Sequence, residues 1–456
     1  MARNRKLSDS TTRKCARAVF DSNCDITIPA CQHMADVNLE ESGEPPSDDY
    51  SQTAIYRQLR PLLMCMKLFG LYFFRSRKEN GKFYTEGTFV YCLFVNVLAV
   101  LNVVRSFTVF RIKDEFDNVL FQKLLFAIWS TECAFKTSLL LWNCYKNNGL
   151  PKFFRQWATV CNNANISKVC LYMMMKYIVL SFLFIFVNSV VFTLILVYVP
   201  VLRHIYLEVI WRNAADYENV VCFQAMLSFL SVLNSSASIF PASLFVVLSF
   251  AVGKRFKKFS CKLEKAIECD LFHAQIEDFR IAYEDLSGLV ETLDEIFSPL
   301  LAAVYFANIP MFCLVLYTTL SSIDIHLSIV LINLFWLSFI LLQMTLVSLT
   351  AVWINVMAHS PLEHIYTIRF SRSSNDTQLQ MFMFLNRLTG TQVGLSAMKL
   401  FVVDKPTILT IAGMMITYFV LLIEFKMPAD TNCACHVNGT IVMDNSTLLI
   451  SHVSYT

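Results

Sequence analysis

The sequence predicts an all-α membrane protein with seven transmembrane helices, a cytoplasmic N-terminus, an extracellular C-terminus and a cytosolic helical anchor. The first reason is composition, because 55% of the 456 residues are hydrophobic and only 16% are charged, which is too apolar for an ordinary soluble domain. The second is a series of seven apolar stretches, each about 20 residues or longer, a length that crosses a bilayer. The third is the distribution of Lys and Arg, which sets the direction of the crossings.

The chain divides into three regions. Residues 1–55 are polar and lack the apolar core of a signal peptide, so we expect a flexible cytosolic tail. Residues 56–425 form the predicted membrane domain, and residues 426–456 an extracellular tail. The predicted spans are 89–110, 119–142, 171–199, 220–251, 298–320, 327–356 and 407–425.

Basic residues collect in alternate loops. They are dense before the first span, between the second and third, after the sixth, and after the fourth, where Lys254, Arg255, Lys257 and Lys258 stand close together. Cytosolic loops carry the excess of Lys and Arg, whereas the other loops here have few. The N-terminus is therefore predicted to lie inside, and an odd number of crossings places the C-terminal tail outside.

The C-terminal tail supports this direction, because it contains glycosylation sequons at Asn438 and Asn445. It also contains Cys433 and Cys435, which are too close together for an easy mutual bridge. A disulfide from one of them to Cys222, at the outer end of the fourth span, is a hypothesis that the sequence leaves open.

The second span contains Glu132 and Lys136, one helical turn apart. One interpretation is a mutually neutralised pair that faces the interior of the bundle. The other is a ligand or gating contact, because ionisable groups inside a membrane are costly and often functional.

Apolar stripes at helical spacing continue beyond the spans. Phe256, Phe259 and Leu263 recur among Lys and Glu after the fourth span, and a second stripe runs from Ile276 to Phe297. Such stripes pack against neighbouring helices or other subunits, or alternatively lie on the membrane surface. The predicted outer loops are short, so we expect a small ligand to bind within the helical bundle itself.

Other classes of function have no positive support in the sequence. It contains no phosphate-binding Gly-rich loop and no G-x-S-x-G turn, so we predict neither an enzyme nor a nucleic-acid partner. His359 and His364 fall on different faces of a helix and lack further ligands, so we expect no metal and no cofactor. A metabotropic seven-helix receptor, which needs its N-terminus outside, and a transporter or enzyme that uses the buried charges remain alternatives.

The last span carries the most specific motif. Thr417 and Tyr418 are followed by five apolar residues and then by Glu424 and Phe425. This pattern resembles the signature of the insect gustatory receptors, which reads Thr-Tyr, five hydrophobic residues, Gln-Phe. The sequence departs from the signature at Glu424, where the family usually has Gln. The resemblance extends loosely over residues 55–425 and includes the segment Gly394–Phe401 before the last span.

The resemblance, through the related insect odorant receptors, implies a subunit of a ligand-gated, non-selective cation channel in the plasma membrane of sensory neurons. It implies a homo- or heterotetramer, opened by a small-molecule tastant, in which the last helices of the subunits line a central pore. Carried over to this sequence, Glu424 and Phe425 would lie at the gate near the outer end, with Thr417, Tyr418 and Leu421 deeper in the pore.

Glu424 has two interpretations in that setting. Copies from each subunit would form a ring of carboxylates that attracts cations and binds Ca²⁺. Alternatively, the side chain points away from the axis and pairs with Lys426 or with lipid headgroups.

The resemblance also places a ligand pocket among spans three to six. The polar and aromatic candidates there are Asn188, Asn234, Ser235, Tyr305, Asn308, Asn333 and Trp336. Each has the alternative of an ordinary packing or helix-to-helix hydrogen-bonding role. Sugar-sensing members tend to have Glu directly after the Tyr of the motif, and Phe419 at that position favours a bitter or other apolar ligand.

Overall fold

The computed structural model describes residues 50–77, 83–85, 87–110, 118–146, 149–198, 221–269, 271–321, 327–368, 375–390 and 392–426. The predictions for the N-terminal tail before Tyr50, for Asn438 and Asn445, and for Cys433 and Cys435 lie outside the described residues. The same holds for the side chains of Phe425 and Lys426.

Seven helices in the described part of the chain are long and apolar enough to cross a membrane, which confirms the predicted number of spans. Their bounds agree with the predicted spans to within a few residues except where α8 and α9 extend much further. The seven helices are α3 (Thr88–Thr108), α4 (Asn118–Tyr145), α6 (Lys168–Tyr198), α8 (Val221–Glu268), α9 (Phe272–Ser321), α10 (Leu327–His359) and α13 (Lys405–Lys426). The direction of the crossings stays a prediction.

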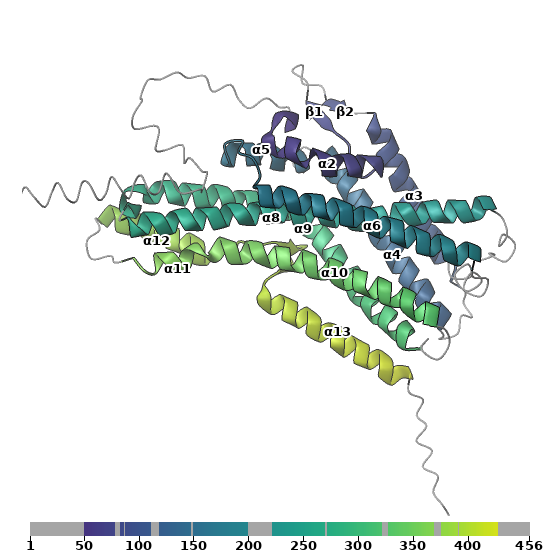
Figure 1. Ribbon diagram of the computed structural model, residues 1–456. Coiled ribbons are helices and arrows are strands. Elements are labelled where there is room, and N and C mark those ends of the chain that lie inside the picture. The colour runs from purple at the N-terminus through teal and green to yellow at the C-terminus, as the bar shows by residue number, and fades with distance from the viewer. Residues whose placement is uncertain are drawn as a thin grey trace, which may run out of the picture.

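Helices α8 and α9 are far longer than a bilayer requires. They contain 48 and 50 residues, or about 70 Å each at the usual helical rise, whereas the hydrocarbon core is about 30 Å thick. The fourth span therefore continues without a break into the stripe that follows it, and the second stripe continues into the fifth span. Figure 1 shows both helices running the length of the molecule, with α11 (Pro361–Ile365) and α12 (Asn375–Gly390) at one end.

The two apolar stripes pack against each other within one chain. The rings of Phe259 and Phe279 meet edge to face with centroids 5.9 Å apart, and those of Phe256 and Tyr283 at 6.0 Å. Phe384 of α12 adds a third ring, 5.7 Å from Tyr283. Of the alternatives left open by the sequence, burial against neighbouring helices is the one that the structure shows.

The remaining elements are short and surround this helical frame. Before α3 lie a 3-10 turn η2 (Tyr50–Gln52), the helix α2 (Ala54–Leu68) and an antiparallel hairpin of β1 (Arg75–Arg77) and β2 (Phe83–Thr85), in which Arg75 pairs with Thr85. The helix α5 (Leu150–Val160) packs on α9, with Phe153, Phe154 and Trp157 fully buried. A second hairpin, β3 (Ser396–Ala397) and β4 (Phe401–Val402), precedes α13.

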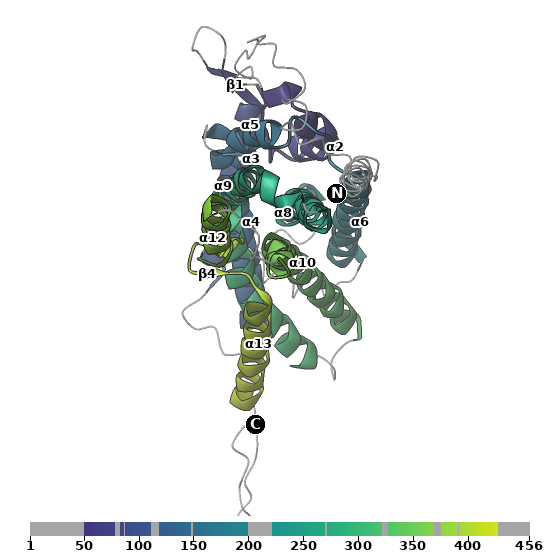
Figure 2. The same cartoon turned by 90° about the vertical axis from the view of Figure 1, so that its left-hand side faces the viewer.

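Helices α8 and α13 are the extremes of burial. In α8, 94% of the most apolar window is buried, whereas in α13 the figure is 11%. Figure 2 shows α13 at the edge of the bundle, alongside α9, its principal neighbour. Most of the surface of α13 is therefore left for lipid or for another subunit.

One glycine allows α8 and α10 to approach each other closely. A Cβ on Gly253 would lie 2.4 Å from two atoms of the Trp353 indole, which is too close for any real contact. Gly87 offers a matched comparison, because nothing lies within 4 Å of the position of its Cβ.

We therefore expect Gly253→Ala to destabilise the fold by about 1–3 kcal/mol, since overpacking outweighs the gain in helix propensity. The measurement is the melting temperature of the purified protein in detergent. Gly87→Ala serves as the control and should change that temperature little. Equal melting temperatures for the two variants would contradict the close α8–α10 contact.

Candidate functional site

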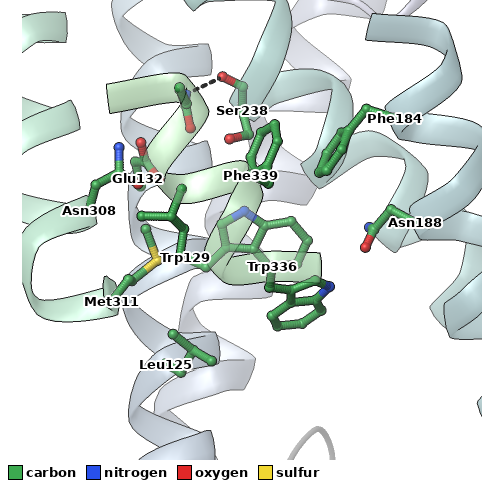
Figure 3. A pocket seen from close by; sticks show the side chains of 12 residues that line it. Leu125, Trp129, Glu132, Phe184, Asn188, Ser238, Asn308, Met311, Trp336 and Phe339 are labelled. Atoms are coloured by element: carbon green, nitrogen blue, oxygen red, sulfur yellow. Dashed lines mark hydrogen bonds between the residues drawn. The ribbon is translucent and has the colours of Figure 1, made fainter. Parts of the chain in front are cut away.

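A cavity of about 30 Å³ lies inside the bundle, where α4, α6, α8, α9 and α10 meet. Its walls are mainly apolar and aromatic, with Glu132 and Asn308 at one side and Asn188 at the other (Figure 3). We call it the central cavity. It is lined by Leu125, Trp129 and Glu132 of α4, Phe184 and Asn188 of α6, Ser238 of α8, Asn308 and Met311 of α9, and Trp336, Phe339, Ile340 and Gln343 of α10.

Aromatic rings form much of the wall. The indoles of Trp129 and Trp336 are 5.9 Å apart between centroids. Phe184 and Phe339 are stacked with centroids 3.7 Å apart and planes inclined by 15°. Such faces suit flat apolar ligands and also attract cations.

The polar side of the cavity is built around the Glu132–Lys136 ion pair. The Lys136 Nζ lies 2.5 Å from Glu132 Oε1, and the two side chains are 0% and 1% exposed respectively. Lys136 also donates to the backbone carbonyl of Ser238 at 3.3 Å, and Gln343 Nε2 donates to the same oxygen at 3.1 Å. The prediction of a neutralised pair facing the bundle interior is confirmed, and Glu132 in addition lines the cavity.

Several polar atoms at this side lack hydrogen bonds. In the described part of the chain, no group donates a hydrogen bond of normal geometry to either oxygen of the Glu132 carboxylate, whose partner is the Lys136 ammonium. Gln343 Oε1 and both amide atoms of Asn308 are likewise buried and unsatisfied among these residues. Figure 3 shows Glu132 and Asn308 on the same side of the cavity. Buried polar atoms without partners are rare and call for an explanation, such as a bound molecule.

The structure places only some of the predicted ligand residues at the central cavity. Asn188, Asn308 and Trp336 line it. Asn234 lines an adjoining cavity of about 20 Å³, together with Arg105 and Trp336.

The other three candidates make contacts elsewhere. Ser235 accepts a hydrogen bond from Asn188 Nδ2 at 2.8 Å, and Asn333 Nδ2 donates to Thr318 at 3.5 Å. The Tyr305 hydroxyl is 2.9 Å from that of Ser348, which ties α9 to α10.

Sequence reasoning missed the aromatic lining residues Trp129, Phe184 and Phe339, and it missed Gln343. Aromatic residues are so abundant in these helices that position alone cannot separate lining from packing. Gln343 carried a usable signal, because an amide in the middle of an apolar span is costly unless it has a partner.

The start of α13 is fixed by a capping interaction. Asp404 is the N-cap residue, and its Oδ1 accepts from Thr407 N at 2.9 Å and from the Thr407 hydroxyl at 2.6 Å. These hydrogen bonds lower the pKa of the Asp404 carboxyl below its usual value. Pro406 follows in the first turn, where its missing N–H costs nothing.

The hairpin before α13 is attached to α9. Asp294 of α9 accepts a hydrogen bond from Ser396 N at 2.6 Å, and the Ser298 carbonyl accepts one from Met398 N at 3.1 Å. The ring of Phe401 packs near that of Tyr305, at 6.1 Å between centroids. Tyr305 lies one turn from Asn308 on α9, so a single helix joins the central cavity to the base of α13.

The residues of the last-helix motif share one face of α13. Thr417, Tyr418, Leu421, Glu424 and Phe425 fall within about 120° of the helix circumference. Tyr418 and Leu421 are 52% and 41% exposed, and Thr417 and Glu424 are also exposed. The buried residues Ile411 and Met415 lie about 20° and 60° beyond the Tyr418 edge of this arc, and the Met415 carbonyl is 3.7 Å from Cys313 Sγ of α9. The motif face therefore has no large packing partner within the described chain.

No three His, Cys, Asp or Glu side chains in the described ranges are grouped closely enough to hold a metal ion. Cys222 is a free, exposed cysteine, and its bridging hypothesis stays open because the other cysteines lie outside the described residues.

Seven apolar helices, five of which enclose an aromatic cavity with polar groups, define a multi-pass membrane protein. The chain belongs to the 7tm chemosensory receptor family, whose family model matches residues 59–428. This is a family of receptors rather than of enzymes.

Solved structures and a curated relative agree with this family. The fold is similar to that of the insect olfactory receptor OR5 from Machilis hrabei in complex with eugenol, with a TM-score of 0.62 at 15% identity, covering 83% of this chain and 100% of that one. A second structure of that receptor gives 0.61 at 13% identity, with the same coverage. High-energy light unresponsive protein 1 of Caenorhabditis elegans is 28% identical over 173 residues, or 37% of this chain and 39% of that protein. That match thus spans about two fifths of the relative's length.

The buried ion pair generates a stability prediction. Lys136→Met leaves the Glu132 charge buried without its partner and should cost about 3–5 kcal/mol. The double variant Glu132→Gln with Lys136→Met removes both charges and should recover most of that loss.

Thermal unfolding of the purified variants measures both effects. Lys152→Met is the control, because the Lys152–Glu295 pair is 3.3 Å long but its side chains are 41% and 50% exposed, and such pairs contribute about 0–1 kcal/mol. If Lys136→Met proved as mild as Lys152→Met, the buried ion pair would not stabilise the bundle as we predict.

Proposed function

We propose that this chain is a gustatory receptor subunit of a ligand-gated, non-selective cation channel, opened by a small apolar tastant that binds in the central cavity. The observation that carries the proposal is the connection through α9. This helix supplies Asn308 to the cavity, and one turn away its Tyr305 contacts Phe401 in the hairpin that begins α13. A ligand that moves Asn308 is therefore in a position to move the base of α13.

The last helix supports a pore-lining role. It is the least buried of the candidate spans, and its motif face is exposed in the single chain. A tetramer in which these faces meet around an axis would bury them and would bring Thr417, Tyr418 and Leu421 into the pore. The resemblance of the motif to that of the gustatory receptors supports this assembly, whether its partners are copies of this chain or other receptor subunits.

The chemistry of the cavity supports a small, largely apolar ligand. Its wall includes Trp129, Phe184, Trp336 and Phe339, whereas a sugar site would need many polar partners. Together with Phe419 in place of Glu in the motif, this favours a bitter or other apolar tastant. We propose the plasma membrane of a sensory neuron as the site of action.

A ligand-panel screen tests the proposal. Cells that express the full chain would be exposed to apolar tastants under voltage clamp, with G-protein signalling blocked. We expect ligand-evoked cation currents that persist under the block. Currents that vanish under the block would instead favour a metabotropic receptor.

Glu424 provides a second test, directed at the pore. With a carboxylate from each subunit at the outer mouth, cations are concentrated and divalent ions bind. We expect Glu424→Gln to weaken Ca²⁺ block about tenfold and to lower the permeability to divalent relative to monovalent cations.

The control for this test is Glu363→Gln, which neutralises an exposed carboxylate of α11, away from the last helix. Reversal potentials in mixed solutions and Ca²⁺ block curves give the measurement. Unchanged selectivity and unchanged block in Glu424→Gln would contradict the carboxylate ring, and would favour pairing of Glu424 with Lys426 or lipid headgroups.

A further inference from the structure

A second cavity of about 70 Å³ adjoins the central cavity, between α6, α8 and α10. We call it the lateral cavity. It is lined mainly by apolar side chains, together with a few hydroxyls. Two of the apolar residues, Leu180 and Leu342, are 40% and 46% exposed on the outside of the bundle. The lateral cavity therefore lies close to the surface that lipid would contact.

The two cavities share part of their lining. Phe184, Phe339 and Gln343 contribute to both. The rings of Phe184 and Phe339 are stacked 3.7 Å apart and lie side by side in Figure 3.

Neither cavity is large enough by itself for an organic ligand. Volumes of about 30 and 70 Å³ hold only a few water molecules, whereas ligand pockets occupy about 300–1,000 Å³. A ligand must therefore enlarge the space. Moving the stacked rings of Phe184 and Phe339 apart would do so by joining the central cavity to the lateral cavity.

Polar atoms that lack a regular hydrogen bond define the chemistry at the inner end, where Glu132 Oε1 is paired with the Lys136 ammonium. The Glu132 carboxylate and Gln343 Oε1 are acceptors, and the Asn308 amide offers both a donor and an acceptor. A hydroxyl, phenol or protonated amine would satisfy these acceptors, and the nearby faces of Trp129 and Trp336 also suit a cation. An anionic group would face the Glu132 carboxylate and is disfavoured.

We propose that a ligand separates Phe184 from Phe339, joins the two cavities, and binds as an elongated amphipathic molecule with a hydrogen-bond donor at Glu132 and Asn308 and an apolar body in the lateral cavity. The inference rests on the proposed function in assigning these cavities to the tastant. It goes further in specifying the shape and chemistry of that tastant.

Matched pairs of probes test the donor. Binding of para-alkyl phenols and of their methyl ethers to the purified full chain is measured by thermal shift, independently of gating. We expect each phenol to bind about tenfold or more tightly than its ether, because the ether has no hydrogen to donate to the Glu132 carboxylate or to Asn308 Oδ1.

Variants locate this preference in the cavity. Asn308→Leu should reduce the ratio between phenol and ether several-fold. The double variant Glu132→Gln with Lys136→Met, which keeps an acceptor at position 132 and leaves no unpaired charge, should reduce it less. Asn96→Leu is the control, since Asn96 of α3 accepts from Thr137 and Ser138 and lines neither cavity. Equal binding of phenols and ethers, or equal effects of Asn308→Leu and Asn96→Leu, would overturn the donor assignment.

The length of the alkyl chain tests the joining of the cavities. Phe339→Ala should extend the longest para-alkyl phenol that binds, because the barrier between the cavities is removed. Phe335→Ala is the control, because Phe335 also stacks on Phe184, at 5.7 Å, but lines neither cavity. The same length limit in wild type and in Phe339→Ala would overturn the proposal that the ligand joins the two cavities.

The outcomes separate the inference from the proposed function. Phenols that bind with the expected preference but evoke no current would leave the site standing and contradict the channel. Currents evoked equally by phenols and ethers would leave the channel standing and contradict the site. If no probe bound, the inference would fall.

Discussion

The arrangement of the bundle depends on one buried ion pair. Glu132 and Lys136 are removed from water inside an apolar bundle, where charges persist only if they neutralise each other and find further polar partners. Lys136 reaches the Ser238 carbonyl on α8, which Gln343 of α10 also bonds, so three helices are held around one point. The central cavity lies beside that point, and the Glu132 oxygens face it without hydrogen bonds from the described residues. The same pair that orders the helices thus supplies the chemistry of the candidate site.

The long helices extend this arrangement beyond the cavity. Because α9 is continuous, Asn308 at the cavity, Tyr305 beside the hairpin and Asp294 beneath it belong to one rigid element. Helix α13 is capped firmly at Asp404 yet packed lightly along its length. Coupling between distant sites requires an element with two arrangements that both sites can bias. Helix α9 contacts both the central cavity and the hairpin before α13, so it is in a position to couple them. Helix α13 is packed lightly enough to move in response.

Much of the fold could be predicted, because lipid imposes simple rules on length and polarity. The span predicted at 407–425 corresponds to Lys405–Lys426, and the pairing of Glu132 with Lys136 follows from their spacing. The continuity of α9 could not be predicted, since Pro299 and Pro310 lie inside it and tertiary packing must hold the helix together there. In the site, Asn188 and Asn308 stood out as amides in apolar helices, whereas Phe184 and Phe339 did not. Only the three-dimensional arrangement distinguishes a lining ring from a packing ring.

The central claim is that binding inside the bundle opens a pore formed by the protein itself. The most direct measurement is the current through the purified full chain in planar bilayers, with no G protein and no nucleotide present. The account predicts discrete cation-selective openings when a phenol that binds the purified chain is added, and loss of those openings when it is washed out. Bound ligand without any openings in such bilayers, together with a response that returns when a G protein is supplied, would contradict it.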